Sequence, residues 1–203
     1  CGTVSSTYPA AEAEKLPVPY LGVVDAAARE AAFSTRNRRI GVIGTAATIR
    51  SRSYEALLRR LVPGVEITAR PCPLFVPLVE AGYVDHSAPD KQEITKLVIA
   101  QYLTEIRDAG VDTLILGCTH YPLLTDIIGD IMGPGVTLIN ASEEGAWELK
   151  RTLRSMDLLA PEKQTGQATL CASDQPEDFG ALASYFLRET LSHPVRPVDI
   201  DRY

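Results

Sequence analysis

Apolar runs and helical patterns alternate along the chain. Short apolar runs bounded by glycine, proline or polar residues predict strands at residues 20–24, 39–44, 65–69, 112–116, 136–139, 168–172 and 195–200. Between them, apolar residues recur at helical spacing and predict helices at residues 25–33, 53–61, 89–109, 122–131, 143–156 and 176–191. Strands that take turns with helices are typical of an α/β fold with mainly parallel sheets.

The run at residues 112–116 is the strongest strand candidate. It is continuously apolar after its first two residues, as expected of a central strand that is covered on both faces. The clearest helix, residues 89–109, precedes it and ends at Gly110, a residue that commonly terminates helices. In parallel sheets, ligands gather where strands end and helices begin, so the residues after position 116 are the first place to look for a site.

Two Cys-x-Thr segments carry the candidate chemistry. Cys118 follows the strand at 112–116, and Cys1 opens the chain. Ser5, Ser6 and Thr7 before residues 9–16 predict a helix start shortly after Cys1, and a strand ahead of Cys1 would put this thiol at an equivalent strand end. Helix N-termini behind both thiols would favour thiolates and bind anions through free N–H groups. The pair therefore predicts chemistry on a substrate held between two thiols.

Composition narrows the protein class. The chain has 203 residues and a net charge of -6, which gives no basic surface for nucleic acid, and no apolar run approaches the roughly 20 residues needed to cross a membrane. Its four cysteines lie far apart, so they are expected to be free thiols in a cytoplasmic protein. Cys72 and Cys171 are interpreted as inert small apolar residues, and His86 and His193 as loop residues. Because no Met opens the sequence, it is expected to begin inside a longer protein.

Four segments resemble one enzyme family. Residues 116–123, Leu-Gly-Cys-Thr-His-Tyr-Pro-Leu, closely resemble the second active-site motif of bacterial glutamate racemases, members of the aspartate/glutamate racemase superfamily. Residues 1–6 are similar to the first cysteine motif of that family, residues 41–48 with 53–54 to its Thr-x-x-Thr loop, and residues 72–80 to its carboxylate-bearing segment. The resemblance covers essentially the whole chain.

The resemblance implies a cofactor-independent enzyme that interconverts L- and D-glutamate with Cys1 and Cys118 as the catalytic pair. It further implies substrate contacts by Gly2, Thr3, Thr119 and His120, and supporting roles for Glu80, Thr45 and Thr48. Glu80 is expected either to orient His120 or to hold the substrate ammonium. The implied biology is a cytoplasmic homodimer that supplies D-glutamate for peptidoglycan, and hence for cell wall biogenesis and cell shape. No metal is expected, and the sequence has no Gly-rich dinucleotide fingerprint.

Two thiols suit the inversion of an α-carbon. Inversion requires that a proton leave one face of the carbon and that another return to the opposite face, so two groups must flank it. A free cysteine has a pKa of about 8.5, so a modest shift makes one thiol a thiolate base while the other remains an acid at neutral pH. The two roles exchange when the substrate is the other enantiomer.

The family also implies two similar lobes, each with a mainly parallel sheet, around a cleft that holds the site. Residues 1–24 with 140–203 are expected to form the first lobe, and residues 25–139 the second. Members of the family carry a segment before the first cysteine, with Asp-Ser and Tyr-Gly pairs that have no counterpart here, so this chain alone is expected to be inactive and its first lobe incomplete. Gly2 also replaces the Asn that is usual in the family, which leaves only a backbone N–H at that place.

Other functions remain open at this stage. An aspartate racemase of the same superfamily is a closely related alternative, although the His-Tyr-Pro after Thr119 favours glutamate. A thiol hydrolase or transferase would use Cys118 as nucleophile and His120 as base, and would leave Cys1 without a role. A non-catalytic module is a further alternative for the chain as given. Zinc held by Cys1, Cys118 and His120 is disfavoured, because their spacing is unlike that of known zinc sites.

Overall fold

A computed structural model of the chain describes residues 1–84 and 88–202, and His86 lies outside the described residues. The chain divides into two compact units, Cys1–Leu158 and Leu159–Tyr203. The assignment of residues 1–24 and 140–203 to one lobe and of residues 25–139 to the other stays a prediction.

A four-stranded parallel sheet forms the centre of the first unit. Its strands are β1 (Arg39–Gly44), β2 (Glu66–Pro71), β3 (Thr113–Leu116) and β4 (Thr137–Asn140), in the order β2-β1-β3-β4. The inner strands β1 and β3 are buried along nearly their whole length, as their continuous apolar runs predict. Since all four strands are parallel, their carboxyl ends lie at the same edge of the sheet. The predicted α/β fold with a parallel sheet flanked by helices is confirmed.

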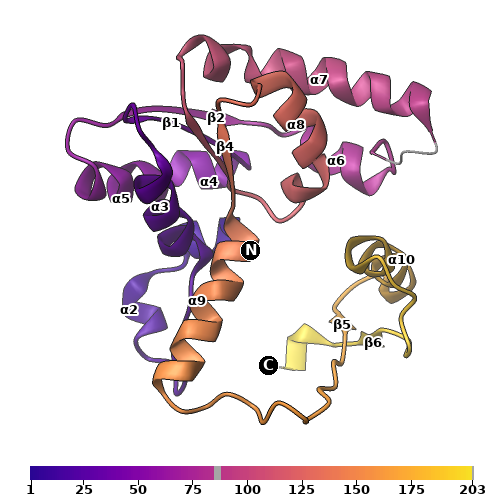
Figure 1. Ribbon diagram of the computed structural model, residues 1–203. Coiled ribbons are helices and arrows are strands. Elements are labelled where there is room, and N and C mark those ends of the chain that lie inside the picture. Colours follow the sequence, from indigo (N-terminus) through magenta and orange to yellow (C-terminus); the bar gives the residue numbers. More distant parts are fainter. Residues whose placement is uncertain (85–87, 203) are drawn as a thin grey trace. The chain divides into compact units, whose positions relative to one another are not determined.

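Helices surround this sheet on both faces (Figure 1). The first unit contains α1 (Gly2–Thr7), α2 (Ala10–Ala13), α3 (Val23–Ser34), α4 (Ala46–Ser51), α5 (Ser53–Leu61), α6 (Phe75–Glu80), α7 (Pro89–Asp108), the 3-10 helix η1 (Tyr121–Leu124), α8 (Thr125–Met132) and α9 (Ala141–Ser155). On one face α3 contacts β3 and β4 and packs against α5 and α9, whereas α7 contacts β2 and packs against α8. The apolar cores under these helices fix the strands, and with them the loops at the strand ends.

Small residues let α3 approach its neighbours closely. Ala27, Ala28 and Ala31 are fully buried in the core that also contains Leu58 of α5. A β-carbon on Gly145 of α9 would lie only 2.8 Å from a methyl group of Val23, so α3 and α9 pack with almost no space between them.

The second unit is small. It contains a two-residue parallel pair, β5 (Cys171–Ala172) with β6 (Arg196–Pro197), together with α10 (Pro176–Leu187) and the 3-10 helix η2 (Ile200–Arg202). The predicted strands at 168–172 and 195–200 are thus reduced to two residues each. None of the described residues of α10 and η2 is buried, so this unit has little core of its own.

The prediction of a strand at residues 20–24 is wrong. Gly22 is extended and Val23 begins α3, where the Val23 N–H donates to the Ser5 hydroxyl at 3.1 Å. The helix start predicted shortly after Cys1 is found at Gly2, so that Ser5, Ser6 and Thr7 lie within α1 and not ahead of it. The helix predicted at 122–131 opens with the 3-10 turn η1. The short helices α4 and α6 were not predicted, because six residues hold too few turns to give a periodic pattern.

Candidate active site

The first cysteine segment forms the start of α1. Cys1 occupies the N-cap position and is exposed, whereas Gly2 is buried. The Ser5 hydroxyl accepts from α3 as described above, and the Ser53 hydroxyl of α5 donates to the Ser6 carbonyl at 2.8 Å. These contacts tie α1, and therefore Cys1, to α3 and α5.

Three threonine hydroxyls form a cluster beside α1. Thr3 Oγ1 lies 2.8 Å from Thr45 Oγ1, which lies 3.0 Å from Thr48 Oγ1. Thr45 also caps α4, because its hydroxyl accepts from the Thr48 N–H at 3.2 Å. The Thr-x-x-Thr loop after β1 and the first cysteine segment are therefore joined by hydroxyl groups.

The second cysteine segment follows β3 and meets the first through two glycines. The Gly117 N–H donates to the Ile43 carbonyl at 2.8 Å and so continues the sheet ladder by one residue. A β-carbon on Gly2 would overlap the Gly117 carbonyl oxygen, so the two backbones are in direct contact. This contact brings the residues that follow Cys1 against the residue that precedes Cys118.

Cys118 is buried at the carboxyl end of β3, with 8% of its surface exposed. Burial raises the pKa of its thiol, although donors from His120 and Thr119 act in the opposite direction. Its Sγ lies 3.9 Å from His120 Nδ1, which is also 3.4 Å from Thr119 Oγ1. Cys118 is therefore buried beside groups that would stabilise its thiolate.

His120 joins this thiol to a carboxylate. His120 Nε2 lies 2.9 Å from Glu80 Oε1 at the C-terminus of α6, where the carboxylate is about half exposed and the imidazole largely covered. The structure thus brings Glu80 to His120, one of the two arrangements expected from the sequence. A carboxylate on Nε2 leaves Nδ1 directed at the thiol.

Tyr54 lies beside the site, although the sequence analysis included it only as part of the Thr-x-x-Thr motif. Tyr54 of α5 is 3% exposed, and its ring contacts Gly117. Its hydroxyl has no hydrogen-bond partner among the atoms that the structure describes. Its position after the Thr-x-x-Thr loop was the only signal in the sequence that could have pointed to it.

The buried Cys72 fits the interpretation as an inert small apolar residue, whereas the exposed Cys171 does not. Cys72 is completely buried, and burial raises the pKa of its thiol to about 12. The Cys72 carbonyl accepts from the Tyr121 hydroxyl at 3.0 Å, and this bond holds the segment that follows Cys118. Cys171 is exposed in the second unit. All four thiols are free, as predicted.

The candidate residues come together at one edge of the sheet. Those of the first unit surround the carboxyl ends of β1 and β3: Cys1, Gly2, Thr3, Thr45, Thr48, Glu80, Cys118, Thr119 and His120. Their individual roles stay predictions. Among the described residues, 1–84 and 88–202, there is no group of three or more His, Cys, Asp or Glu side chains that could hold a metal ion. Of the described helices, none is long and apolar enough to cross a membrane.

Comparison with known proteins identifies relatives of this chain. Residues 1–149 match the family model described as Asp/Glu/Hydantoin racemase. A glutamate racemase of Geobacter metallireducens is 43% identical over 187 residues, which cover 92% of this chain and 67% of the relative. The chain thus spans about two thirds of the length of that protein.

Solved structures give the same result. A glutamate racemase from Bacillus anthracis superposes with a TM-score of 0.88 at 32% identity, over 98% of this chain and 72% of the other. The glutamate racemase from Francisella tularensis in complex with D-glutamate superposes with a TM-score of 0.86 at 30% identity, over 100% of this chain and 73% of the other. Likeness of fold and sequence therefore extends over nearly the whole chain.

Proposed function

Because the chain belongs to the Asp/Glu/hydantoin racemase family, we propose that it is a cofactor-independent glutamate racemase with Cys1 and Cys118 as its proton-transfer pair. The observation that carries the proposal is the contact of Gly2 with Gly117, which brings the segments of the two thiols together at the end of β3. The relatives named above support glutamate as the substrate, and one of them was solved in complex with D-glutamate.

The two thiols are proposed to take opposite roles on the two faces of the α-carbon. Cys118 is buried, and burial raises the pKa of its thiol, which suits the donation of a proton, while Cys1 would remove the proton from the other face. For the other enantiomer, Cys118 must first lose its proton. The donors from His120 and Thr119 would then stabilise the thiolate.

Neutral donors next to the thiols suit the two carboxylates of glutamate. The hydroxyls of Thr3, Thr45 and Thr48 form one group and Thr119 adds another, and hydroxyls can donate to carboxylates without adding charge. Such preorganised donors would stabilise the negative charge that spreads from the α-carbon into the carboxylate during proton transfer. Glu80 is proposed to act through His120, because its carboxylate already bonds that imidazole.

The proposed activity has a consequence for the cell. D-glutamate is a building block of peptidoglycan, so the enzyme would contribute to cell wall biogenesis and cell shape. We propose a cytoplasmic homodimer, on the family resemblance alone. The finer alternatives within the superfamily, aspartate racemase above all, are separated by substrate.

One observation favours a second function. Cys118, His120 and Glu80 form a chain of thiol, imidazole and carboxylate, with Sγ to Nδ1 at 3.9 Å and Nε2 to Oε1 at 2.9 Å. The same order of groups activates nucleophiles in thiol hydrolases. Such an enzyme would leave the α-hydrogen of an amino acid in place and would not need Cys1.

Deuterium incorporation in heavy water distinguishes these functions. The α-carbons of L- and D-glutamate are followed by NMR, with L- and D-aspartate as a parallel pair, using the 203-residue chain and a version that carries the family's preceding segment. The expected result is exchange and inversion of both glutamate enantiomers in the version that carries the preceding segment, and none in the 203-residue chain. The absence of exchange with all four amino acids in both versions would reject the racemase and leave the hydrolase to be tested with thioesters.

A further inference from the structure

The residue that follows His120 is completely buried. Tyr121 opens η1 with none of its surface exposed, whereas Thr119 is exposed and His120 is partly so. The Tyr121 N–H donates to the Cys118 carbonyl at 3.1 Å and closes a turn around these two residues. Cys118 and Tyr121 are therefore the buried anchors of the turn. The place of the imidazole depends on how each anchor is held.

The hydroxyl of Tyr121 joins this turn to two other strand ends. It donates to the Cys72 carbonyl at 3.0 Å, in keeping with the need of a buried phenol for an acceptor. Cys72 directly follows β2, and its N–H donates to the Gly44 carbonyl at the end of β1, also at 3.0 Å. Burial raises the pKa of the Tyr121 hydroxyl, so the group stays a neutral donor. These bonds fix the turn after β3 against the ends of β1 and β2.

The ring of Tyr121 supports the helix that carries Glu80. It meets Phe75, the first residue of α6, edge to face, with the ring centroids 5.1 Å apart and the planes at 65°. The Cys72 carbonyl that accepts from the Tyr121 hydroxyl also accepts from the Phe75 N–H, at 3.2 Å. Tyr121 therefore holds the start of α6 by its ring and, through Cys72, by its hydroxyl. Glu80 is the last residue of the same helix.

His120 and Glu80 meet where these two supports end. Their hydrogen bond, Nε2 to Oε1 at 2.9 Å, joins residues 40 positions apart, and the carboxylate is about half exposed. Water competes for an exposed carboxylate, so burial does not maintain this bond. Its geometry requires that the turn and α6 keep their places. Tyr121 contacts both.

We propose that Tyr121 is a positioning residue for the His120–Glu80 pair: its hydroxyl and its ring hold the turn that bears His120 against the helix that bears Glu80, so that Nδ1 of the imidazole stays directed at Cys118. The effect of Tyr121 on catalysis rests on the proposed function, whereas its effect on the pair does not. Catalysis depends on such placement, because small displacements of a reacting group cost large factors in rate.

The first test observes the pair directly. The imidazole ¹⁵N shifts of His120 show which nitrogen carries the proton, and they are measured by NMR on the 203-residue chain in mildly alkaline solution, with His120→Gln to assign the signals. Tyr121→Phe keeps the ring, and the Cys72 carbonyl keeps the Phe75 N–H as a donor, so the variant should fold. We expect the proton on Nε2 in the wild type, held there by Glu80, and a mixture of both tautomers in Tyr121→Phe.

A matched control lies on the other side of Phe75. Tyr102 of α7 also meets the Phe75 ring, with centroids 5.4 Å apart, but it does not belong to the turn. Tyr102→Phe should therefore leave the ¹⁵N shifts of His120 unchanged. Wild-type shifts in Tyr121→Phe would overturn the proposal.

A double-mutant cycle separates positioning from a general loss of stability. In the version that carries the family's preceding segment, kcat with glutamate is measured for Tyr121→Phe, for Glu80→Gln and for both together. We expect Tyr121→Phe to lower kcat about three- to tenfold, and the double variant to match Glu80→Gln within about twofold, because both changes disable the same pair. Losses that multiply in the double variant would also overturn the proposal. If the wild type exchanges no α-hydrogen, the proposed function fails, and the ¹⁵N shifts still decide the role of Tyr121.

Discussion

Gly2 and Gly117 touch backbone to backbone, and this contact joins the two cysteine segments. Gly2 is buried against the carbonyl oxygen of Gly117, and its absent side chain is what permits the approach. A close approach of two main chains is a place where glycine has a specific function. The distance between the two thiol segments therefore depends on a position that has no chemistry of its own.

Gly2→Ala should separate the two segments. Its β-carbon would overlap a backbone oxygen, which cannot rotate away, so α1 must shift. We expect at least a tenfold loss of racemisation, and a loss of about 1–3 kcal/mol in the free energy of unfolding if α1 stays docked. Gly135→Ala is the matched control, because its β-carbon would have no neighbour within 4 Å. Wild-type racemisation kinetics in Gly2→Ala would show that the contact does not set the geometry of the site.

Removal of either thiol should abolish racemisation. In the version that carries the family's preceding segment, Cys1→Ala and Cys118→Ala each eliminate one of the two groups that flank the α-carbon, so racemisation should fall by roughly 10²- to 10⁴-fold. The remaining thiol should still exchange the α-hydrogen of one enantiomer, and NMR in heavy water identifies which one. Cys171→Ala, an exposed thiol in the second unit, should match the wild type. Full racemisation in either of the first two variants would disprove the two-thiol scheme.

Glu80→Gln should lower the rate without removing the hydrogen bond to His120. The amide oxygen can still accept from Nε2, but the negative charge next to the imidazole is lost. We expect kcat to fall roughly tenfold, with little change in the urea midpoint because the carboxylate is about half exposed. Glu93→Gln, in a surface pair with Lys96, is the control. An unchanged kcat in Glu80→Gln would mean that the carboxylate has no part in catalysis.

The sequence predicts the parts of this fold that depend on local patterns. Residues 39–44 and 53–61 are found as predicted, because a continuous apolar run and a strongly periodic segment each encode their structure locally. Residues 20–24 were predicted as a strand from their apolar content, but Val23 is turned into a helix start by a hydroxyl of Ser5. That bond joins residues 18 positions apart in the chain. Local patterns do not reveal such tertiary contacts.

The site also contains residues that local motifs identify and residues that only the fold brings together. Cys118 and His120 stand in one contiguous motif, so the sequence identifies them directly, and Glu80 comes from a second motif. The choice between orienting His120 and holding the substrate could not be made from the sequence, because only the fold brings residues 40 positions apart to 2.9 Å. The contacts of Tyr54 and Gly2 with Gly117 were missed for the same reason. They arise where strands from distant segments end side by side.

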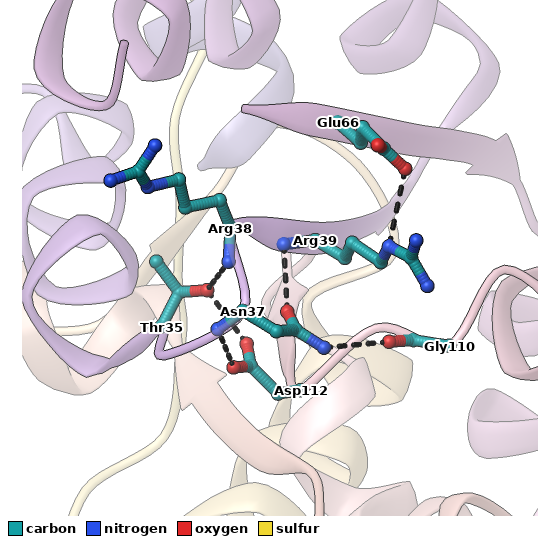
Figure 2. Close-up of polar contacts among 7 residues, drawn as sticks. All are labelled: Thr35, Asn37, Arg38, Arg39, Glu66, Gly110 and Asp112. Carbon is teal, nitrogen blue, oxygen red and sulfur yellow. Dashed lines mark hydrogen bonds and ion pairs between the residues drawn. The ribbon is translucent and has the colours of Figure 1, made fainter. Parts of the chain in front are cut away.

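Asp112 holds the opposite edge of the sheet together (Figure 2). Its carboxylate accepts from the Thr35 hydroxyl at 2.7 Å and from the backbone N–H groups of Arg36 and Asn37, each at 2.6 Å. This fixes the turn between α3 and β1 against the start of β3. Burial alone would raise the pKa of Asp112, but these bonds, with one from Thr113, outweigh it and lower the pKa.

Asp112→Asn should therefore destabilise the protein in a pH-dependent way. Since the folded pKa of Asp112 is depressed, its contribution to stability is complete above the unfolded pKa of about 3.9 and is lost as the pH falls through the folded value. We expect the variant to lose about 1–2 kcal/mol at neutral pH, and the gap from the wild type to close in acid. Urea unfolding followed by fluorescence of Trp147, the single tryptophan, measures both. Asp108→Asn, exposed at the end of α7, should show no such gap, and a gap for Asp112→Asn that persists unchanged in acid would mean that the charged bonds are not its cause.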